Sequence, residues 1–186
     1  MCIVRQNKAS KIKGFSLIEL LLAVAILGIL IALSLPSFQD TIESMTTNSQ
    51  VKVLLTTLSY ARSEAVRQGR NVGICASNDG VDCDAGDWSE GWLVFVNASG
   101  TADGDTGSVG GANTLLRVFE IDTLGSNSSL TFTVDLFEYN SLGFSDTAGV
   151  QTFLICPSSN NANNARSIEI AGSGRGRRIE DGLTCP

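Results

Sequence analysis

Three arginines lie close together near the C-terminus, in the segment Gly174-Arg175-Gly176-Arg177-Arg178. A guanidinium donates two parallel hydrogen bonds from a planar fork, and this fork matches the oxygens of a phosphate group. The two glycines allow a tight backbone turn, so the pattern predicts a turn from which all three arginines project. The cluster therefore indicates binding of phosphate groups. Such binding ignores base sequence, because phosphate contacts carry no base information.

The same arginines have a second interpretation, in which they serve only the surface of the protein. Glu169, Glu180 and Asp181 lie nearby in the sequence and are possible ion-pair partners. Exposed ion pairs of this kind are common and contribute little free energy. The segment would then be a solvated turn without a ligand, and the sequence leaves both interpretations open.

The composition narrows the class of function. The chain has 186 residues, a net charge of −6 and no histidine. Catalytic dyads, triads and metal sites that use histidine are therefore excluded, and the sequence has no phosphate-binding loop or zinc-type cysteine spacing. We expect no enzyme activity, no catalytic residue, no cofactor and no metal site. The oxygen-rich stretch around Asp103 and Asp105 is interpreted as a solvated turn, with calcium binding as the open alternative.

A lone carboxylate, Glu19, lies near the start of an apolar run from Phe15 to Leu35. A helix of this length spans about 30 Å, which is the thickness of a bilayer core. A charged side chain inside a membrane span costs about 2.5–3.5 kcal/mol, so Glu19 needs a partner. Cleavage after Gly14 would supply one, because it creates a positively charged amine on Phe15.

The residues before this run, 1–14, contain four basic residues and no acidic residue. Basic residues that precede an apolar span stay in the cytoplasm, which predicts that the rest of the chain faces the periplasm. We interpret 1–14 as a leader that is removed. The remaining chain has a net charge of −10. Such a charge argues against general attraction to nucleic acid and leaves the arginine cluster as the place of any such contact.

A long helix and a β-rich domain must position these residues. We assign 15–36 to a transmembrane and assembly helix and 37–69 to its amphipathic continuation, where apolar residues recur at three- and four-residue steps. Residues 70–186 are predicted to form a periplasmic domain of short strands, with a polar loop at 97–113. This order predicts an α+β fold in which the helix packs on antiparallel sheets. The predicted strands are 71–76, 91–96, 115–121, 130–139, 152–156 and 167–170.

Four cysteines remain once the leader is removed, at Cys75, Cys83, Cys156 and Cys185. An even number of cysteines in a periplasmic domain favours disulfides, and four cysteines allow three connectivities. We favour Cys75–Cys83 and Cys156–Cys185, because each bond joins nearest neighbours in the sequence. The second bond would enclose the arginine cluster in a closed loop.

The N-terminal order of basic leader, Gly14-Phe15 junction and Glu19 resembles the prepilin-peptidase signature of type IV pilins and pseudopilins. Two later stretches, 61–70 and 91–96, make the chain similar to the GspH/FimT family of these proteins. The resemblance implies the type IV pilin fold, cleavage by a prepilin peptidase and methylation of the new N-terminus. It also implies a single-pass inner-membrane protein that joins other pilin subunits through Glu19 in an extracellular filament or at its tip.

DNA-capturing members of this family contact DNA through a C-terminal Gly-Arg-x-Arg motif. Gly174, Arg175, Gly176 and Arg177 match this motif, and Arg178 adds a further charge. The resemblance therefore implies a minor pilin that binds double-stranded DNA non-specifically for uptake in natural transformation. Two other roles fit the same family, a minor pilin that primes the filament and a pseudopilin of type II secretion, and the sequence does not decide between the three.

Overall fold

The computed structural model describes residues 15–83, 88–98, 113–120, 128–180 and 182–186. The chain divides into two compact units, 1–39 and 40–186, and each is described by itself. The predicted leader with Gly14, most of the predicted polar loop with Asp103 and Asp105, and Asp181 lie outside the described residues.

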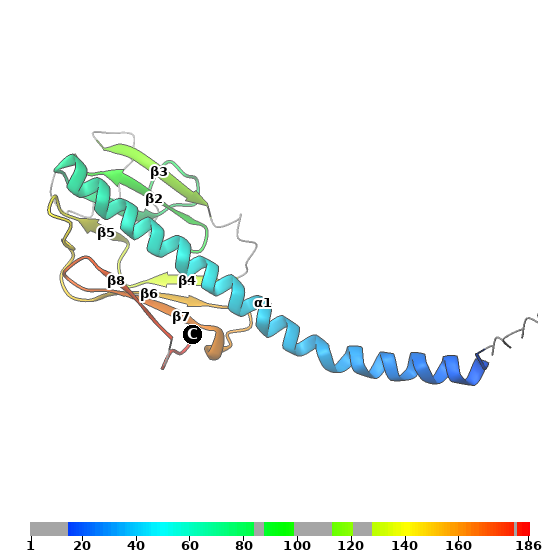
Figure 1. The fold of residues 1–186 in the computed structure, drawn as a ribbon. Helices are drawn as coiled ribbons and strands as arrows, with labels where there is room; N and C mark the ends of the chain where they lie inside the picture. Colours follow the sequence, from blue (N-terminus) through cyan, green and yellow to red (C-terminus); the bar gives the residue numbers. More distant parts are fainter. Residues whose placement is uncertain (1–14, 84–87, 99–112, 121–127, 181) are drawn as a thin grey trace, which may run out of the picture. The chain divides into compact units, whose positions relative to one another are not determined.

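Helix α1 runs from Leu17 to Gln68, close to the predicted bounds (Figure 1). The helix ends at Gly69, whose φ of +64° is in the left-handed region. Beyond it the Arg70 N–H donates to the Ala65 carbonyl at 3.3 Å. A left-handed glycine with such a bond is a common stop for an α-helix, because it satisfies carbonyls that the last turn leaves free.

The described apolar side chains of the first unit are exposed, among them Phe15, Leu22 and Ile29. Glu19 lies in the first turn of α1. Within the residues that the structure describes, no helical stretch combines the length and the hydropathy that a membrane crossing needs.

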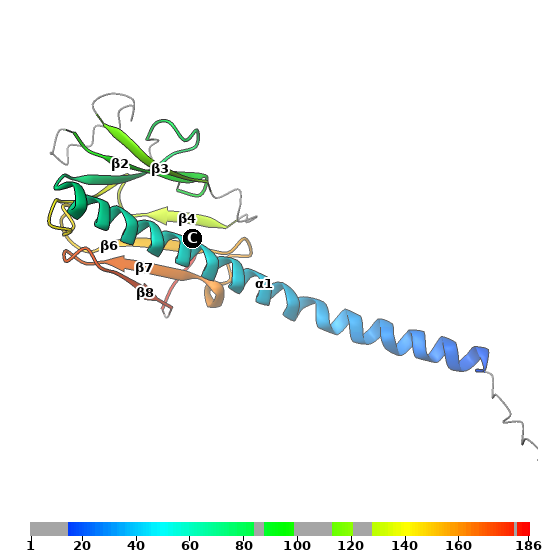
Figure 2. The same ribbon diagram turned by 45° about the horizontal axis from the view of Figure 1, so that its top comes forward.

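The second unit packs α1 from Asp40 onward against two antiparallel sheets of four strands each (Figures 1 and 2). The first sheet has the order β3-β2-β1-β5, and the second has the order β4-β6-β7-β8. A short 3-10 helix, Ala162–Asn164, precedes β7. The strands are β1 Val72–Ala76, β2 Gly91–Val96, β3 Thr114–Glu120, β4 Ser129–Phe132, β5 Leu136–Tyr139, β6 Gln151–Cys156, β7 Arg166–Ile170 and β8 Gly176–Ile179.

The core of the second unit joins one face of α1 to the inner faces of both sheets. A buried polar pair helps to fix the helix in place, since Trp92 Nε1 donates to Thr57 Oγ1 at 3.2 Å. The helix also shares a core with strands of the second sheet, among them β6 and β7. The buried helix residues recur at three- and four-residue steps, as predicted, and are Val51, Leu54, Leu58, Ala61 and Ala65.

The prediction of one strand over 130–139 is wrong, because this run forms β4 and β5 in different sheets. The chain leaves the second sheet at Thr133. The hydroxyl of Thr133 accepts the Thr152 N–H at 3.2 Å and donates to Gln151 Oε1 at 2.8 Å. The side chain thus takes a hydrogen bond that a continuing strand would have made through its backbone.

The prediction of a turn throughout 174–178 is also wrong. Gly174 lies in a turn, but Gly176–Ile179 forms β8, which pairs with β7 so that Glu169 lies opposite Arg177. A Cβ added at Gly176 would lie 3.1 Å from Leu55 Cδ2, so this glycine lets the strand approach α1 closely. Tertiary packing here overrides the low strand propensity of glycine.

Both favoured disulfides are present in the structure, Cys75–Cys83 and Cys156–Cys185. Their cysteines are 8 and 29 residues apart in the sequence. The longer loop contains β7 and β8 and ties the C-terminal residues to the end of β6. The arginine segment is therefore part of a covalently closed loop.

We predict that replacing Cys156 and Cys185 together with alanine lowers the free energy of unfolding by about 3.5 kcal/mol, the value expected from loop-closure entropy. Chemical denaturation of the full chain in neutral detergent measures this loss. The control replaces Cys75 and Cys83, whose shorter loop predicts a smaller loss of about 2.5 kcal/mol. Cys75 and Cys156 are each 1% exposed and leave similar cavities, whereas their partners differ, since Cys83 is buried and Cys185 is half-buried. A larger loss for the shorter loop would contradict the entropic account.

Candidate nucleic-acid interface

The turn before β8 is held by Tyr139 at the end of β5. Tyr139 is fully buried, and its hydroxyl donates to the Gly174 carbonyl at 3.0 Å. Burial raises the pKa of the Tyr139 hydroxyl, and the positive charge of Arg62 opposes that rise only in part. The hydroxyl therefore keeps its proton across the physiological range of pH and remains a hydrogen-bond donor to the turn.

Only glycine fits at position 174, because the backbone there has a positive φ and neighbouring atoms leave no space for a Cβ. Its φ is +75°, in the left-handed region. A Cβ at this position would also lie 2.5 Å from the Gly143 carbonyl oxygen and 2.8 Å from Tyr139 Cε1. Real Cβ atoms do not approach other atoms so closely, so a side chain at this position would displace the Gly143 backbone or the buried Tyr139 ring. Gly174 thus fixes the direction in which the chain enters Arg175.

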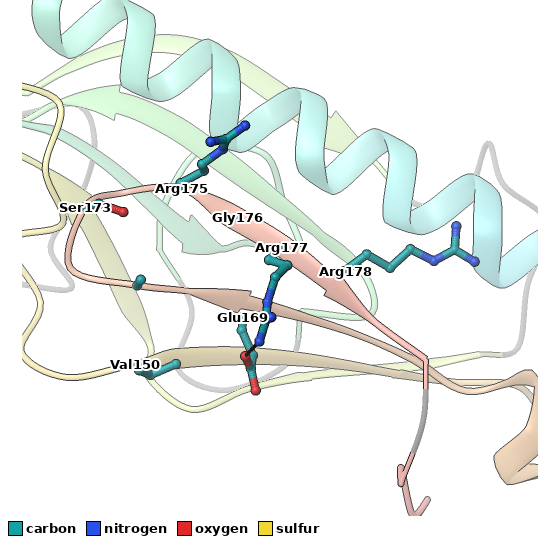
Figure 3. Close-up of a pocket in the computed structure, with 8 residues that line it drawn as sticks. Val150, Glu169, Ser173, Arg175, Gly176, Arg177 and Arg178 are labelled. Atoms are coloured by element: carbon teal, nitrogen blue, oxygen red, sulfur yellow. Dashed lines mark hydrogen bonds and ion pairs between the residues drawn. The ribbon is translucent and has the colours of Figure 1, made fainter.

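The three arginines do not project together, contrary to the prediction. In Figure 3 the side chain of Arg175 points towards α1, while that of Arg177 points towards Glu169 on β7. Arg177 and Arg178 are neighbours on a strand, so their side chains leave opposite faces. The segment therefore presents its charges in different directions, and each arginine has its own surroundings.

Arg177 forms an exposed cross-strand pair with Glu169, in which Nη2 lies 3.0 Å from Oε2. The Arg177 side chain is 73% exposed and that of Glu169 is 38% exposed. Exposed pairs of this kind contribute about 0–1 kcal/mol, so a phosphate can compete with the carboxylate for the guanidinium.

Arg178 is tied into the protein. Its Nη2 lies 2.7 Å from Glu180 Oε1 and also donates to Asn48 Oδ1 of α1. The side chain is only 31% exposed. Arg166 Nε donates to the same Asn48 oxygen at 3.2 Å, so one side chain of α1 holds two strands. For Arg178 the structure thus agrees with the second interpretation, a surface role with an acidic partner.

Arg175 is exposed, and its side chain has no hydrogen bond or ion pair among the described residues. It lines two hollows that meet at Gly176. The larger has a volume of about 750 Å³ and includes Glu169 and Arg177 (Figure 3). The smaller has a volume of about 220 Å³ and lies between α1 and the turn, where Arg62 is also part of the lining.

The remaining predicted positions lie elsewhere. Phe15 is 82% exposed beside the start of α1, and Gly14 is outside the described residues. Within the ranges that the structure describes, no three cysteine, aspartate or glutamate side chains gather as a metal site would require. The stretch with Asp103 and Asp105 is outside those ranges, so the calcium alternative stays untested.

The sequence gives no sign that Tyr139 or Asn48 lies near the arginine segment, and only an indirect one for Arg62. These residues are distant along the chain, and only the packing of β5 and α1 brings them to β8. One signal was available for Arg62, because it lies in the helical stretch that characterises the family resemblance.

Two family models match the chain. The model described as type II transport protein GspH matches residues 50–174, which is more than half of the chain. The model described as the prokaryotic N-terminal methylation motif matches residues 9–35. The first match ends at Gly174, so strand β8 with Arg177 and Arg178 lies beyond it.

Curated relatives include the fimbrial protein of Moraxella nonliquefaciens, 36% identical over 98 residues, which are 50% of this chain and 60% of that protein. The pilin-like protein PilA1 of Thermus thermophilus is 33% identical over 100 residues, which are 54% of this chain and 58% of that protein. The chain thus spans about three fifths of the length of these relatives.

A crystal structure of the type IV minor pilin FimU from Pseudomonas aeruginosa PAO1 has a TM-score of 0.55 to this structure and 24% identity. It covers 75% of this chain and 92% of the other. A second crystal form has a TM-score of 0.53 and 26% identity, with 74% and 96% covered. This likeness confirms the predicted α+β type IV pilin fold.

We predict that Gly174→Ala lowers the thermal unfolding temperature of the full chain more than Gly149→Ala does. Both glycines have positive φ, +75° and +84°, so both changes carry the strain of a left-handed alanine, about 1–2 kcal/mol. Only Gly174 adds a clash, because nothing lies within 4 Å of a Cβ at Gly149. Circular dichroism measures both transitions, and equal shifts would show that the close approach to Gly143 and Tyr139 has no energetic role.

Proposed function

The chain belongs to the GspH family of type IV pilin-like proteins, and we propose that it is a minor pilin that binds double-stranded DNA through Arg175 and Arg177 for uptake in natural transformation. One observation carries the proposal. Arg175 is exposed without an acidic partner among the described residues, and the neighbouring Arg177 has only an exposed one. Two guanidiniums are therefore available to phosphates at one edge of the protein.

Electrostatics sets the scale of this binding. Each phosphate contact on duplex DNA contributes about −0.9 to the slope of log affinity against log salt concentration. Two contacts predict a slope of about −1.8. This salt dependence is shallower than the slope of about −2.7 that three projecting arginines would give. The acidic body further weakens binding, with its net charge of −10 after leader removal. Two phosphate contacts bind DNA weakly, so stable binding needs several subunits that contact the same DNA. A filament that carries more than one copy of the subunit provides these additional contacts.

A structural role without DNA binding, in filament priming or in type II secretion, is the second candidate. It is supported by the pairs Arg177–Glu169 and Arg178–Glu180, which give two of the three arginines partners within the protein. In that case the segment would serve the packing of β8 on α1, and Arg175 would be a solvated side chain.

For the N-terminal part we propose that a prepilin peptidase cuts after Gly14 and that Phe15 becomes the methylated N-terminus. The match to the methylation motif over 9–35 supports this. We propose that 15–36 anchors the chain in the inner membrane with 70–186 in the periplasm, and later packs against other pilin subunits in the filament. The exposed apolar side chains of this helix support such surroundings, because water does not favour so continuous an apolar surface.

We predict that Glu19→Gln leaves cleavage of the leader intact but lowers incorporation into filaments by at least about tenfold. The change removes the carboxylate that would compensate the N-terminal amine of a neighbouring subunit, a contact in a low-dielectric environment that costs several kcal/mol to break. Intact-mass measurement reports cleavage, and the amount in sheared filaments reports assembly. The control is Glu90→Gln, which removes an exposed carboxylate of the second unit. Normal assembly of the Glu19 variant would refute the charge-pairing proposal.

We predict that the full chain in neutral detergent binds a short fluorescent DNA duplex, and that replacing Arg175 and Arg177 together with Gln abolishes detectable binding in a gel shift. In fluorescence anisotropy the salt slope should become shallower by about 1.8, and the unfolding temperature should stay unchanged. The control replaces Arg67 and Arg70, two exposed arginines of similar charge near the end of α1. Equal losses in both double variants would indicate a diffuse charge effect, and unchanged binding would end the DNA proposal for this segment.

A further inference from the structure

We infer that the smaller hollow, between α1 and the turn before β8, is a phosphodiester site in which Arg62 and Arg175 bind the same DNA phosphate. The inference rests on the proposed DNA binding and adds a residue of α1 to it. Figure 3 shows that Arg175 points towards α1, the helix that carries Arg62.

The hollow has the size of one phosphate group with its adjoining sugar carbons. Its volume is about 220 Å³, below the about 300–1,000 Å³ that pockets for whole drug-sized ligands occupy. Its lining combines apolar side chains with hydroxyl and guanidinium groups. The lining residues are Leu55, Leu58, Ser59, Arg62, Tyr139 and 174–176.

The side chain of Arg62 lies close to the loop that follows β5. A Cβ at Gly143 would lie 3.2 Å from Arg62 Nε, and the Gly143 carbonyl in turn lies against Gly174. The charge of Arg62 also acts on the buried hydroxyl of Tyr139, which binds the Gly174 carbonyl. The loop after β5 therefore packs against both Arg62 and the residue that precedes Arg175.

Arg62 and Arg175 differ from the other described arginines in their partners. Arg67, Arg177 and Arg178 pair with glutamates. Arg70 donates to a backbone carbonyl, Arg166 donates to several oxygens, and Arg117 lies over the rings of Tyr60 and Phe119. Within the described part of the chain, neither Arg62 nor Arg175 has a hydrogen bond, ion pair or ring contact of its guanidinium.

Two unneutralised guanidiniums that line one small hollow repel each other, and an anion between them would remove that repulsion. Both can donate forked hydrogen bonds to the two free oxygens of a phosphodiester. Ser59 Oγ, which now donates to the Leu55 carbonyl at 2.8 Å, lines the same hollow and adds a rotatable donor.

The arrangement favours a polyanion over an isolated phosphate group. Arg175 and Gly176 line both hollows, so the phosphate site continues into the larger hollow, which Arg177 also lines. One phosphate of a DNA strand can bind Arg62 and Arg175, and the next phosphate of the same strand can bind Arg177. A single lipid headgroup would occupy only the smaller hollow and would leave Arg177 without a phosphate.

The test is a double-mutant cycle on DNA binding, measured by anisotropy with the full chain in neutral detergent. We expect Arg62→Gln to weaken binding about tenfold when Arg175 is present, the value of one charge-assisted hydrogen bond. In the Arg175→Gln background the same change should weaken binding less than about twofold, because the shared phosphate is already lost. Arg67→Gln, the same change five residues further along α1, should have no such effect.

Three results would overturn the inference. An unchanged affinity of Arg62→Gln excludes Arg62 from the site while leaving the proposed function intact. Equal losses in both backgrounds show that Arg62 and Arg175 act on different groups. Displacement of DNA by glycerophosphoglycerol at equal phosphate concentration assigns the hollow to membrane headgroups.

Failure of the unaltered chain to bind DNA refutes the proposed function itself. Arg62→Lys keeps the charge without the fork and should bind with intermediate affinity, which guards against loss of folding in the Gln variant.

Discussion

The contact between Tyr139 and Gly174 determines where the arginines of this protein lie. The buried hydroxyl of β5 binds the carbonyl of a residue whose side chain is a single hydrogen, and no other side chain fits between Tyr139 and Gly143. From this turn the chain enters β8, where Gly176 approaches Leu55 of α1 closely. The disulfide Cys156–Cys185 closes the loop around the strand. These contacts hold the arginine segment in one arrangement.

That arrangement separates three chemically identical side chains into different roles. Arg178 faces α1 and holds the strand to Asn48, whereas Arg177 lies on the open face of the sheet. Arg175 precedes the strand and lines the same hollow as Arg62 of the helix. Pairing with Glu180 compensates the less exposed charge, since a charge removed from water is costly without a partner. The exposed Arg177 can exchange its partner Glu169 for a phosphate at little cost, which is the property that a reversible phosphate contact needs.

Much of this organisation could be predicted from the sequence. The helix, its glycine stop and five of the strand positions follow from local periodicity and turn residues, and the disulfide pairing follows from neighbour spacing. The division of 130–139 between two sheets could not be predicted, because it depends on the hydrogen bonds of Thr133 with a distant strand. Strand β8 could not be predicted either, since glycine and arginine favour a turn until β7 and α1 are in place. The clustered arginines of 174–178 indicated the candidate site from the sequence, but the geometry of the site depends on long-range packing.

NMR chemical-shift mapping tests the central claim most directly, namely that the held segment before and within β8 is where this pilin-like protein meets DNA. Backbone amides and arginine Nε–H groups of the full chain in neutral detergent would be followed as a short duplex is added. The account predicts that the largest changes occur at Arg175, Arg177 and Arg62, while Arg178 and Arg67 change little. Changes centred on the exposed side of β3, or none at all at saturating DNA, would contradict it.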